Sequence, residues 1–209
     1  MSPDQVIVQQ PPQAAEKLIL LFHGVGDNPV SMGDIGRYFT ASFPNALIVS
    51  IGSPFACDLG QGRQWFSVQG VTEENRHRRI ADAMPLFIKT VRDWQQKCAV
   101  TSENTVLIGF SQGAIMSLES TKIEQNLAGR IVSFSGRFAR LPESPIASGT
   151  RIHFIHGTSD PVIAANNAVI AAERLTALGC ANTLDLAQKV AHGINPQMIE
   201  TAIERLQAE

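Results

Sequence analysis

One serine of this chain stands in a pattern that can do nucleophilic chemistry. Residues 109–113 read Gly-Phe-Ser-Gln-Gly, which is a G-x-S-x-G motif. An apolar run typical of a strand precedes Ser111, and a helix-forming stretch follows it at once. A sharp turn from strand to helix lifts a serine hydroxyl above a sheet and sets it at a helix N-terminus, where N–H groups favour negative charge. The motif therefore predicts that Ser111 is a nucleophile, although a serine that caps a helix beside two packing glycines gives the same pattern.

A serine hydroxyl is a weak nucleophile, so it needs a base and a group that orients the base. After this kind of turn the acid and then the histidine follow the serine in chain order. Asp160 follows the apolar run at 151–155, and His192 lies in a loop between a weaker run at 183–186 and the last helical stretch. Both residues thus stand after strands, at the same edge as Ser111. We expect Ser111, Asp160 and His192 to form a catalytic triad.

Other residues compete for these roles and fit them less well. Asp185 is the second candidate acid, but it falls inside the run at 183–186. His77 reads as part of a solvated helix start, and His153 as a core histidine inside a strand. His23 and His156 each precede a glycine where a strand ends, so we interpret both as residues that shape loops.

Acyl transfer also needs donors for the negative charge that develops on the carbonyl oxygen. The backbone N–H that follows the nucleophile, that of Gln112, supplies one. A glycine-rich loop at 23–27 follows the first long apolar run and allows close approach of its backbone. We assign the second donor of this oxyanion hole to the Val25 N–H, the alternative being an ordinary turn between a strand and a helix.

The elements that must position these groups alternate along the chain. Near-continuous apolar runs, typical of strands covered on both faces, occupy 18–22, 46–51, 105–110, 131–134, 151–155 and, more weakly, 183–186. Helical patterns lie between them, at 80–97, 112–124, 164–178 and from Pro196 onward. This alternation predicts an α/β fold with a mostly parallel sheet, whose carboxyl edge collects the chemistry.

Size and charge exclude several classes of protein. The 209 residues suit one domain, in which residues 1–16 form an N-terminal extension or an edge strand. Seventeen basic and nineteen acidic residues give a net charge of −2, which argues against nucleic acid or an anionic membrane surface as the main partner. The basic run at 76–79 reads as a solvated helix start, or as a site that attracts anionic substrates.

The cysteines and the apolar runs indicate in which cellular compartment the protein works. No apolar run approaches the roughly 20 residues of a membrane helix, and the N-terminal sequence has no pattern of a secretory signal. Cys57, Cys98 and Cys180 are odd in number and widely spaced, without a C-x-x-C pair, so we expect reduced thiols and no zinc site. We therefore predict a cytoplasmic protein without integral membrane association.

These blocks together resemble the phospholipase/carboxylesterase family of serine α/β-hydrolases, which includes the acyl-protein thioesterases. The resemblance spans essentially the whole chain and rests on residues 21–27, 63–66, 109–114, 156–162 and 191–193. It implies an α/β-hydrolase fold, with a doubly wound sheet in one compact domain that has no large lid. It implies hydrolysis of small carboxylic esters with short or medium acyl chains, no cofactor and no metal, and the same triad of Ser111, Asp160 and His192.

The resemblance also bears on substrate binding. It implies that Trp65 and Phe66 line the acyl pocket, whereas the residues alone fit packing in the core or a lid equally well. Ser67 stands where many relatives carry an aspartate, so their acyl preferences do not transfer.

Several alternatives stay open at this point. An acyl-protein thioesterase, a lysophospholipase and a non-catalytic binding protein share these features. A dienelactone-type hydrolase would carry cysteine in place of Ser111. The sequence also leaves a homodimer open.

Overall fold

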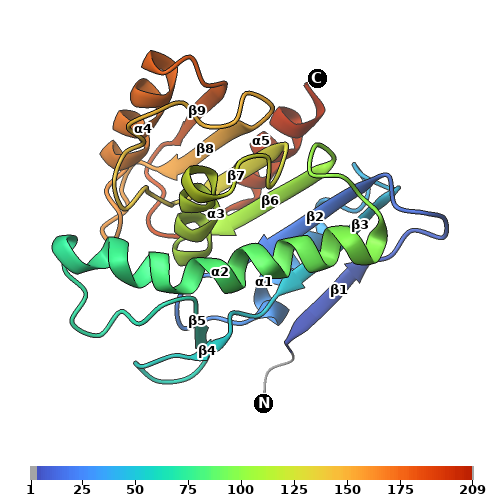
Figure 1. The fold of residues 1–209 in the computed structure, drawn as a ribbon, viewed down its shortest axis with the longest axis horizontal. Helices are drawn as coiled ribbons and strands as arrows, with labels where there is room; N and C mark the ends of the chain where they lie inside the picture. The colour runs from blue at the N-terminus through green and yellow to red at the C-terminus, as the bar shows by residue number, and fades with distance from the viewer. Residues whose placement is uncertain (1–3, 209) are drawn as a thin grey trace.

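The computed structural model describes residues 4–208, and its centre is one seven-stranded sheet with the order β1-β3-β2-β6-β7-β8-β9 (Figure 1). Every neighbouring pair of strands is parallel except β1 with β3 at one edge. The predicted mostly parallel sheet is thereby confirmed. Its strands are β1 (Gln5–Gln9), β2 (Lys17–Phe22), β3 (Ala46–Ile51), β6 (Thr105–Phe110), β7 (Arg130–Phe134), β8 (Arg151–Gly157) and β9 (Asn182–Ala187).

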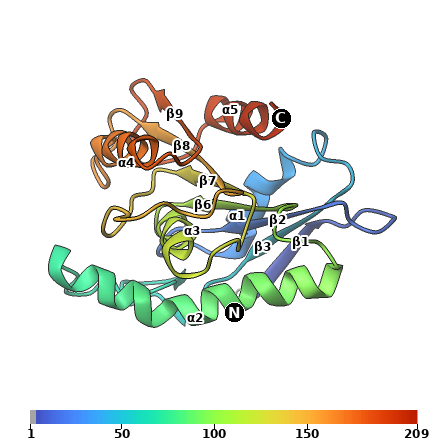
Figure 2. The same ribbon diagram turned by 45° about the horizontal axis from the view of Figure 1, so that its top comes forward.

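Helices cover both faces of the sheet, as Figure 2 shows with α2 and α5 on opposite sides. The described helices are α1 (Pro29–Arg37), α2 (Glu73–Cys98), α3 (Gln112–Ile123), α4 (Asn166–Ala177) and α5 (Pro196–Gln207). Side chains alternate along β2, because successive residues of a strand point to opposite faces. Leu18, Leu20 and Phe22 pack in the cluster under α2, α3 and α4, while Ile19 and Leu21 pack in the cluster under α1 and α5. The sheet is therefore doubly wound, and its core is two-sided.

Helix α1 and a small hairpin of β4 (Phe55–Ala56) and β5 (Arg63–Gln64) were not predicted from the sequence. The helix has a polar cap, since the Asn28 side chain accepts from the backbone N–H groups of Val30 and Ser31. It also contains Gly33 and Gly36, which weaken helix propensity. A Cβ on Gly36 would lie 3.2 Å from the Leu21 side chain, so tertiary packing against the sheet, rather than local preference, stabilises this helix.

Helix α2 begins seven residues earlier than the apolar pattern predicted, at Glu73 instead of residue 80. A reciprocal capping box sets this start: the Thr72 side chain accepts from the Asn75 N–H, and the Asn75 side chain accepts from the Thr72 N–H. The basic run at 76–79 therefore occupies the first turns of the helix. Arg79 donates to the carbonyls of Ser67, Gln69 and Gly70, so it holds a loop in place.

The N-terminal segment contributes an edge strand to the sheet. Strand β1 occupies part of the segment 1–16, while residues 1–3 and 209 of the predicted domain lie outside the described residues. Within residues 4–208, each connection between consecutive strands of the main sheet holds at most one helix. In the same range, no helix is both long enough and apolar enough to cross a membrane. Cys57, Cys98 and Cys180 are free thiols.

Candidate active site

Ser111 sits at the sharp turn that joins β6 to α3. Its backbone has φ 50° and ψ −113°, a conformation that a residue with a side chain adopts only under strain. A Cβ on Gly109 would lie 2.4 Å from the Ala114 nitrogen, and one on Gly113 would lie 2.1 Å from the Phe22 carbonyl oxygen. Both glycines are thus required by close backbone approach. The turn has the geometry that the G-x-S-x-G motif predicts.

The structure brings the three predicted triad residues together at the carboxyl edge of the sheet. Ser111 follows β6, Asp160 follows β8, and His192 lies between β9 and α5. The His192 Nε2 atom is 2.9 Å from Ser111 Oγ, and the His192 Nδ1 atom is 2.7 Å from Asp160 Oδ2. An ionised carboxylate only accepts hydrogen bonds, so Nδ1 carries the proton and Nε2 accepts from the serine hydroxyl. The Phe110 ring lies against the imidazole, with 5.0 Å between the ring centroids.

Asp160 is held as a buried carboxylate by several donors. Its Oδ1 atom accepts from the backbone N–H groups of Val162 at 2.8 Å and Ile163 at 2.9 Å, and its Oδ2 atom accepts from His192. Burial by itself raises the pKa of this carboxyl, but the hydrogen bonds from His192, Ile163 and Val162 outweigh burial and hold the pKa below its ordinary value. The group opposite His192 is therefore ionised at neutral pH.

The competing acid and one other histidine are engaged elsewhere, and His77 lies in α2. Asp185 lies in β9 and forms a two-point ion pair with Arg205 of α5, at 2.7 and 3.0 Å. His153 is buried in β8, with its Nδ1 atom 2.9 Å from Thr183 Oγ1, as expected for a core histidine. His77 is half-buried in the first turns of α2. Asp160 is thus the carboxylate that His192 meets.

The glycine-rich loop at 23–27 lies against Ser111, because a Cβ on Gly24 would be 3.4 Å from Ser111 Cβ. His23 is fully buried under this loop, donates from Nδ1 to the Gly24 carbonyl at 2.7 Å and accepts at Nε2 from the Ser53 N–H at 3.0 Å. Burial lowers the pKa of His23, which keeps the ring neutral in this tautomer. The C=O and N–H of a trans peptide point in opposite directions, so holding the Gly24 carbonyl also sets the direction of the Val25 N–H.

Both N–H groups that the sequence assigned to the oxyanion hole are available. Within residues 4–208, neither the Val25 N–H nor the Gln112 N–H donates a hydrogen bond to another protein group. Gln112 is the first residue of α3, where N–H groups have no partner inside the helix. This helix start and the glycine-rich loop flank Ser111, which suits two donors for one developing oxyanion.

Comparison with known proteins identifies the family. The family model for phospholipase/carboxylesterase matches residues 3–209. The chain belongs to this family. It is 50% identical over 206 residues to esterase YpfH of Escherichia coli K12, an alignment that covers 99% of this chain and 88% of that protein. It is 27% identical to acyl-protein thioesterase 1 of Kluyveromyces lactis, over 72% of each chain. As a member of this family the protein is an esterase, as the sequence predicted.

Solved structures agree with the assigned fold. The crystal structure of esterase PE8 superposes with a TM-score of 0.88 at 26% sequence identity, covering 99% of this chain and 98% of that one. The carboxylesterase of Bacillus cereus superposes with a TM-score of 0.82 at 16% identity, covering 98% and 93% respectively. The second likeness shows the fold alone. The predicted α/β-hydrolase fold is therefore confirmed.

The side chain of Gln112 has a role in the esterase that the sequence analysis missed. Its Oε1 atom accepts from the Trp65 N–H at 2.7 Å, and its Nε2 atom donates to the Phe66 carbonyl at 2.7 Å. The Trp65 indole N–H in turn donates to the His23 carbonyl at 3.0 Å. A long polar side chain next to Ser111 must find such partners when it is buried, and that requirement was the available signal. Segment 65–66 is thus tied to both the catalytic turn and the glycine-rich loop.

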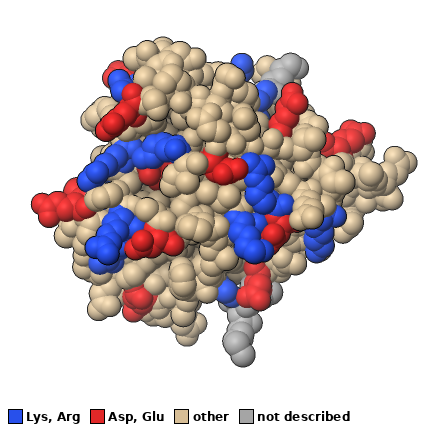
Figure 3. Space-filling view, viewed as in Figure 1, with Lys and Arg blue, Asp and Glu red and all other residues tan. Residues whose placement is uncertain are grey.

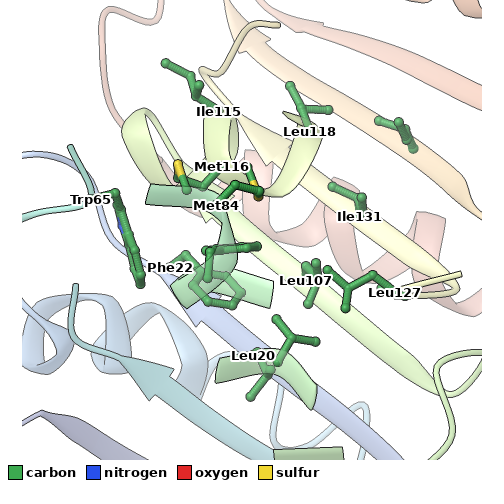
Figure 4. Packing of buried hydrophobic residues seen from close by; sticks show 14 of the residues in the cluster. Leu20, Phe22, Trp65, Met84, Leu107, Ile115, Met116, Leu118, Leu127 and Ile131 are labelled. Atoms are coloured by element: carbon green, nitrogen blue, oxygen red, sulfur yellow. The ribbon is translucent and has the colours of Figure 1, made fainter. Parts of the chain in front are cut away.

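The two aromatic residues assigned to substrate binding lie in this tied segment. Trp65 is almost fully buried and lies beside Phe22 in the core (Figure 4). Its ring centroid is 5.5 Å from that of Phe22 and 5.5 Å from that of Phe87. Trp65 and Phe66 also line a cavity of about 410 Å³ between the β4–β5 hairpin and α2. Much of the Trp65 ring therefore belongs to the core, and the segment as a whole forms a wall beside the catalytic turn.

Charged groups surround the same cavity. Ser67 Oγ donates to the carboxylate of Asp58, and this bond is the main cause of the lowered pKa of Asp58. A carboxylate thus lies beside Ser67, at the edge of this cavity. No group of three or more His, Cys, Asp or Glu side chains within residues 4–208 is arranged to hold a metal ion.

Proposed function

We propose that this esterase cleaves carboxylic esters with short to medium acyl chains, with Ser111 as nucleophile, His192 as base and Asp160 as the residue that orients the base. The observation that carries the proposal is the pair of hydrogen bonds, 2.9 and 2.7 Å long, that link the three side chains in the order serine, histidine, aspartate. Nucleophile, base and orienting group are then each within reach of the next.

In the first half of the reaction, Ser111 Oγ attacks the ester carbonyl carbon while His192 Nε2 takes the hydroxyl proton. The bond between the carbonyl carbon and the alcohol oxygen then breaks, and the imidazolium gives that proton to the leaving alcohol. Asp160 keeps Nδ1–H directed at its own Oδ2 and stabilises the positive charge on the ring. The product of this half is an acyl-enzyme on Ser111.

In the second half, water replaces the alcohol and His192 acts again as base. The water loses a proton to Nε2, its oxygen attacks the acyl carbon, and the bond to Ser111 Oγ breaks as the proton returns to the serine. In both halves the N–H groups of Val25 and Gln112 donate to the carbonyl oxygen. Losing one such donor costs about 2.7–4 kcal/mol of transition-state stabilisation in a comparable hydrolase.

We further propose that Trp65 and Phe66 form part of the wall that receives the acyl chain. Support comes from their backbone bonds to Gln112, which hold them beside the nucleophile. A thioester would pass through the same steps, and the relative named acyl-protein thioesterase 1 makes thioesters the second substrate class to test.

The substrate is a small molecule. The free thiols favour the cytoplasm as the compartment of this esterase.

On the face shown in Figure 3, lysine and arginine side chains are interspersed with aspartate and glutamate. Such a mixed face does not attract polyanions such as nucleic acid.

The test is hydrolysis of p-nitrophenyl esters from acetate to palmitate by the wild type, Ser111→Ala and Ser144→Ala. The last is a matched control, because Ser144 is an exposed serine in the loop between β7 and β8. We expect turnover that peaks at short or medium chains, is unchanged in Ser144→Ala, and falls by about 10⁴-fold or more in Ser111→Ala. A Ser111→Ala variant with more than about a tenth of the wild-type rate, far above that expectation, would remove Ser111 from its role.

A further inference from the structure

Asp160 is approached by a second histidine that the proposed reaction does not use. His156 lies near the end of β8, and its Nε2 atom is 2.8 Å from the Ile163 carbonyl oxygen and 3.2 Å from Asp160 Oδ2. Neither the His156 nor the Asp160 side chain has any exposed surface. This histidine is therefore sealed inside the protein on the far side of the triad carboxylate from solvent.

The partners of His156 determine where its proton lies. The Ile163 carbonyl can only accept a hydrogen bond, so the neutral ring carries its proton on Nε2. That N–H donates to the Ile163 carbonyl at 2.8 Å, while the 3.2 Å approach of Nε2 to Asp160 Oδ2 is a contact outside hydrogen-bond geometry. The Nδ1 atom is buried and has no hydrogen-bond partner. All polar contacts of the ring are thus made at its Asp160 end.

An unpartnered buried nitrogen lowers stability, so an apolar side chain of the same size would fill this space better if packing were the only requirement. The hydrogen bond to the Ile163 carbonyl supplies a reason for an imidazole here, because the N–H of the same Ile163 donates to Asp160 Oδ1. An ionised carboxylate has about four lone-pair sites. Val162 and Ile163 take two on Oδ1, His192 takes one on Oδ2, and the His156 ring lies against Oδ2.

The backbone around His156 fixes the relative positions of the two histidines. A Cβ on Gly157 would lie 2.3 Å from the Val190 carbonyl oxygen, so the end of β8 packs tightly against the segment that leads to His192. The Ser159 N–H donates to the same Val190 carbonyl at 3.0 Å. The loop that carries Asp160 is therefore attached both to His156 and to the approach to His192.

We propose that His156 is a positioning residue for the esterase reaction: its Nε2–H holds the Ile163 carbonyl, and with it the loop whose N–H groups keep Asp160 in line with the Nδ1–H of His192. This inference rests on the proposed triad and adds a fourth side chain to it. Without the His156 donor, the loop at 160–163 can shift, the Asp160 carboxylate turns with it, and the alignment of His192 with Ser111 loosens. His156 touches no substrate, so its loss lowers kcat and leaves KM unchanged.

Three substitutions separate this role from packing. His156→Gln keeps an amide N–H at about the reach of Nε2. His156→Asn reaches only about as far as Nδ1, and it is the matched polar control because Nδ1 has no partner. His156→Leu fills the space without polar atoms, so it remains informative if the asparagine variant does not fold. The loss of a buried hydrogen bond that leaves its partner unpaired corresponds to about tenfold to a hundredfold in rate.

The measurements are kcat and KM for a p-nitrophenyl ester, the melting temperature, and the low-field proton resonance of His192 Nδ1–H, assigned by its absence in His192→Ala. We expect kcat to fall by about tenfold to a hundredfold in His156→Asn and His156→Leu, with KM constant and the His192 resonance shifted or broadened. His156→Gln should recover most of kcat and the resonance.

Two outcomes overturn the inference while the triad stands. The first is a folded His156→Leu enzyme with wild-type kcat. The second is a loss of activity that merely follows the loss of folded protein, with an unshifted His192 resonance and no rescue by glutamine. A Ser111→Ala enzyme that keeps its activity is a different failure, since it removes the proposed function itself.

Discussion

The side-chain amide of Gln112 bonds to the backbone of Trp65 and of the residue after it, so the start of α3 is tied directly to the segment beside Ser111. Both bonds are 2.7 Å long and buried. The backbone N–H of the same glutamine is the proposed oxyanion donor. One residue therefore links the proposed oxyanion hole to the proposed acyl wall.

We predict that Gln112→Glu changes acyl selection as well as rate. A glutamate keeps the acceptor for the Trp65 N–H, but it places an oxygen opposite the Phe66 carbonyl, where the amide now donates. Losing this buried bond should cost about 1–3 kcal/mol and lower the melting temperature by several degrees. The measurement is kcat/KM for acetate, butyrate and octanoate esters. Gln125→Glu, on an exposed loop, is the control, and equal ratios of kcat/KM in both variants would contradict the link.

A second prediction concerns the turn itself. Gly113→Ala puts a Cβ 2.1 Å from the Phe22 carbonyl oxygen, so the backbone must shift, and the free energy of unfolding should fall by about 3 kcal/mol or more. Gly149→Ala meets no atom within 4 Å and serves as the control. Urea unfolding of the two variants measures the difference. Similar stability in both would mean that the turn tolerates a side chain at position 113.

The comparison of sequence and structure separates two kinds of feature. The proximity of Ser111, Asp160 and His192 could be predicted from the sequence, because each residue follows a strand of one parallel sheet and parallel strands end at one edge. The contact between His156 and Asp160 could not be predicted in this way, because it depends on the path of the loop between the two residues. Sequence patterns report which elements form, whereas contacts such as this one arise only when loops fold back.

Helix α1 is an element of secondary structure that local sequence alone does not predict. Asn28 and Pro29 are a typical helix start, but two glycines follow in the next turns. Their value becomes clear only from the packing, since Gly33 and Gly36 let the helix lie close to Val6, Val8 and Leu21. A local propensity argument counts them as helix breakers.

A third prediction follows from His23, whose pKa is lowered by burial in the folded protein. An unfolded histidine takes up a proton near pH 6.5, whereas folded His23 resists protonation until lower pH. The unfolded state thus binds more protons in this window, so the free energy of unfolding falls as pH drops from about 6.5 toward the lowered pKa. His23→Gln should flatten this dependence. Urea titrations at pH 7.5 and 5.5 test it, and equal pH dependence in both proteins would contradict it.

The last prediction compares the two aspartates that the sequence offered as the triad acid. Asp160→Asn removes the group that orients His192, and the equivalent change in a serine protease lowers kcat by about 10⁴-fold. Because hydrogen bonds hold the pKa of Asp160 below its ordinary value, its contribution to stability is present above about pH 3.9 and is lost as pH falls through the lower folded pKa. If the rate is measured against pH between 5 and 8, any fall in rate toward acid pH therefore does not come from protonation of Asp160.

Asp185→Asn is the matched substitution. The partner of Asp185 is Arg205, and the pair is partly exposed, so its loss should cost at most about 1 kcal/mol of stability and leave kcat unchanged. Steady-state kinetics and urea unfolding of both variants give the comparison. A large loss of kcat in Asp185→Asn, with Asp160→Asn still active, would mean that Asp185 in β9 orients the base instead of Asp160. It would also require His192 to leave the position it holds between Asp160 and Ser111.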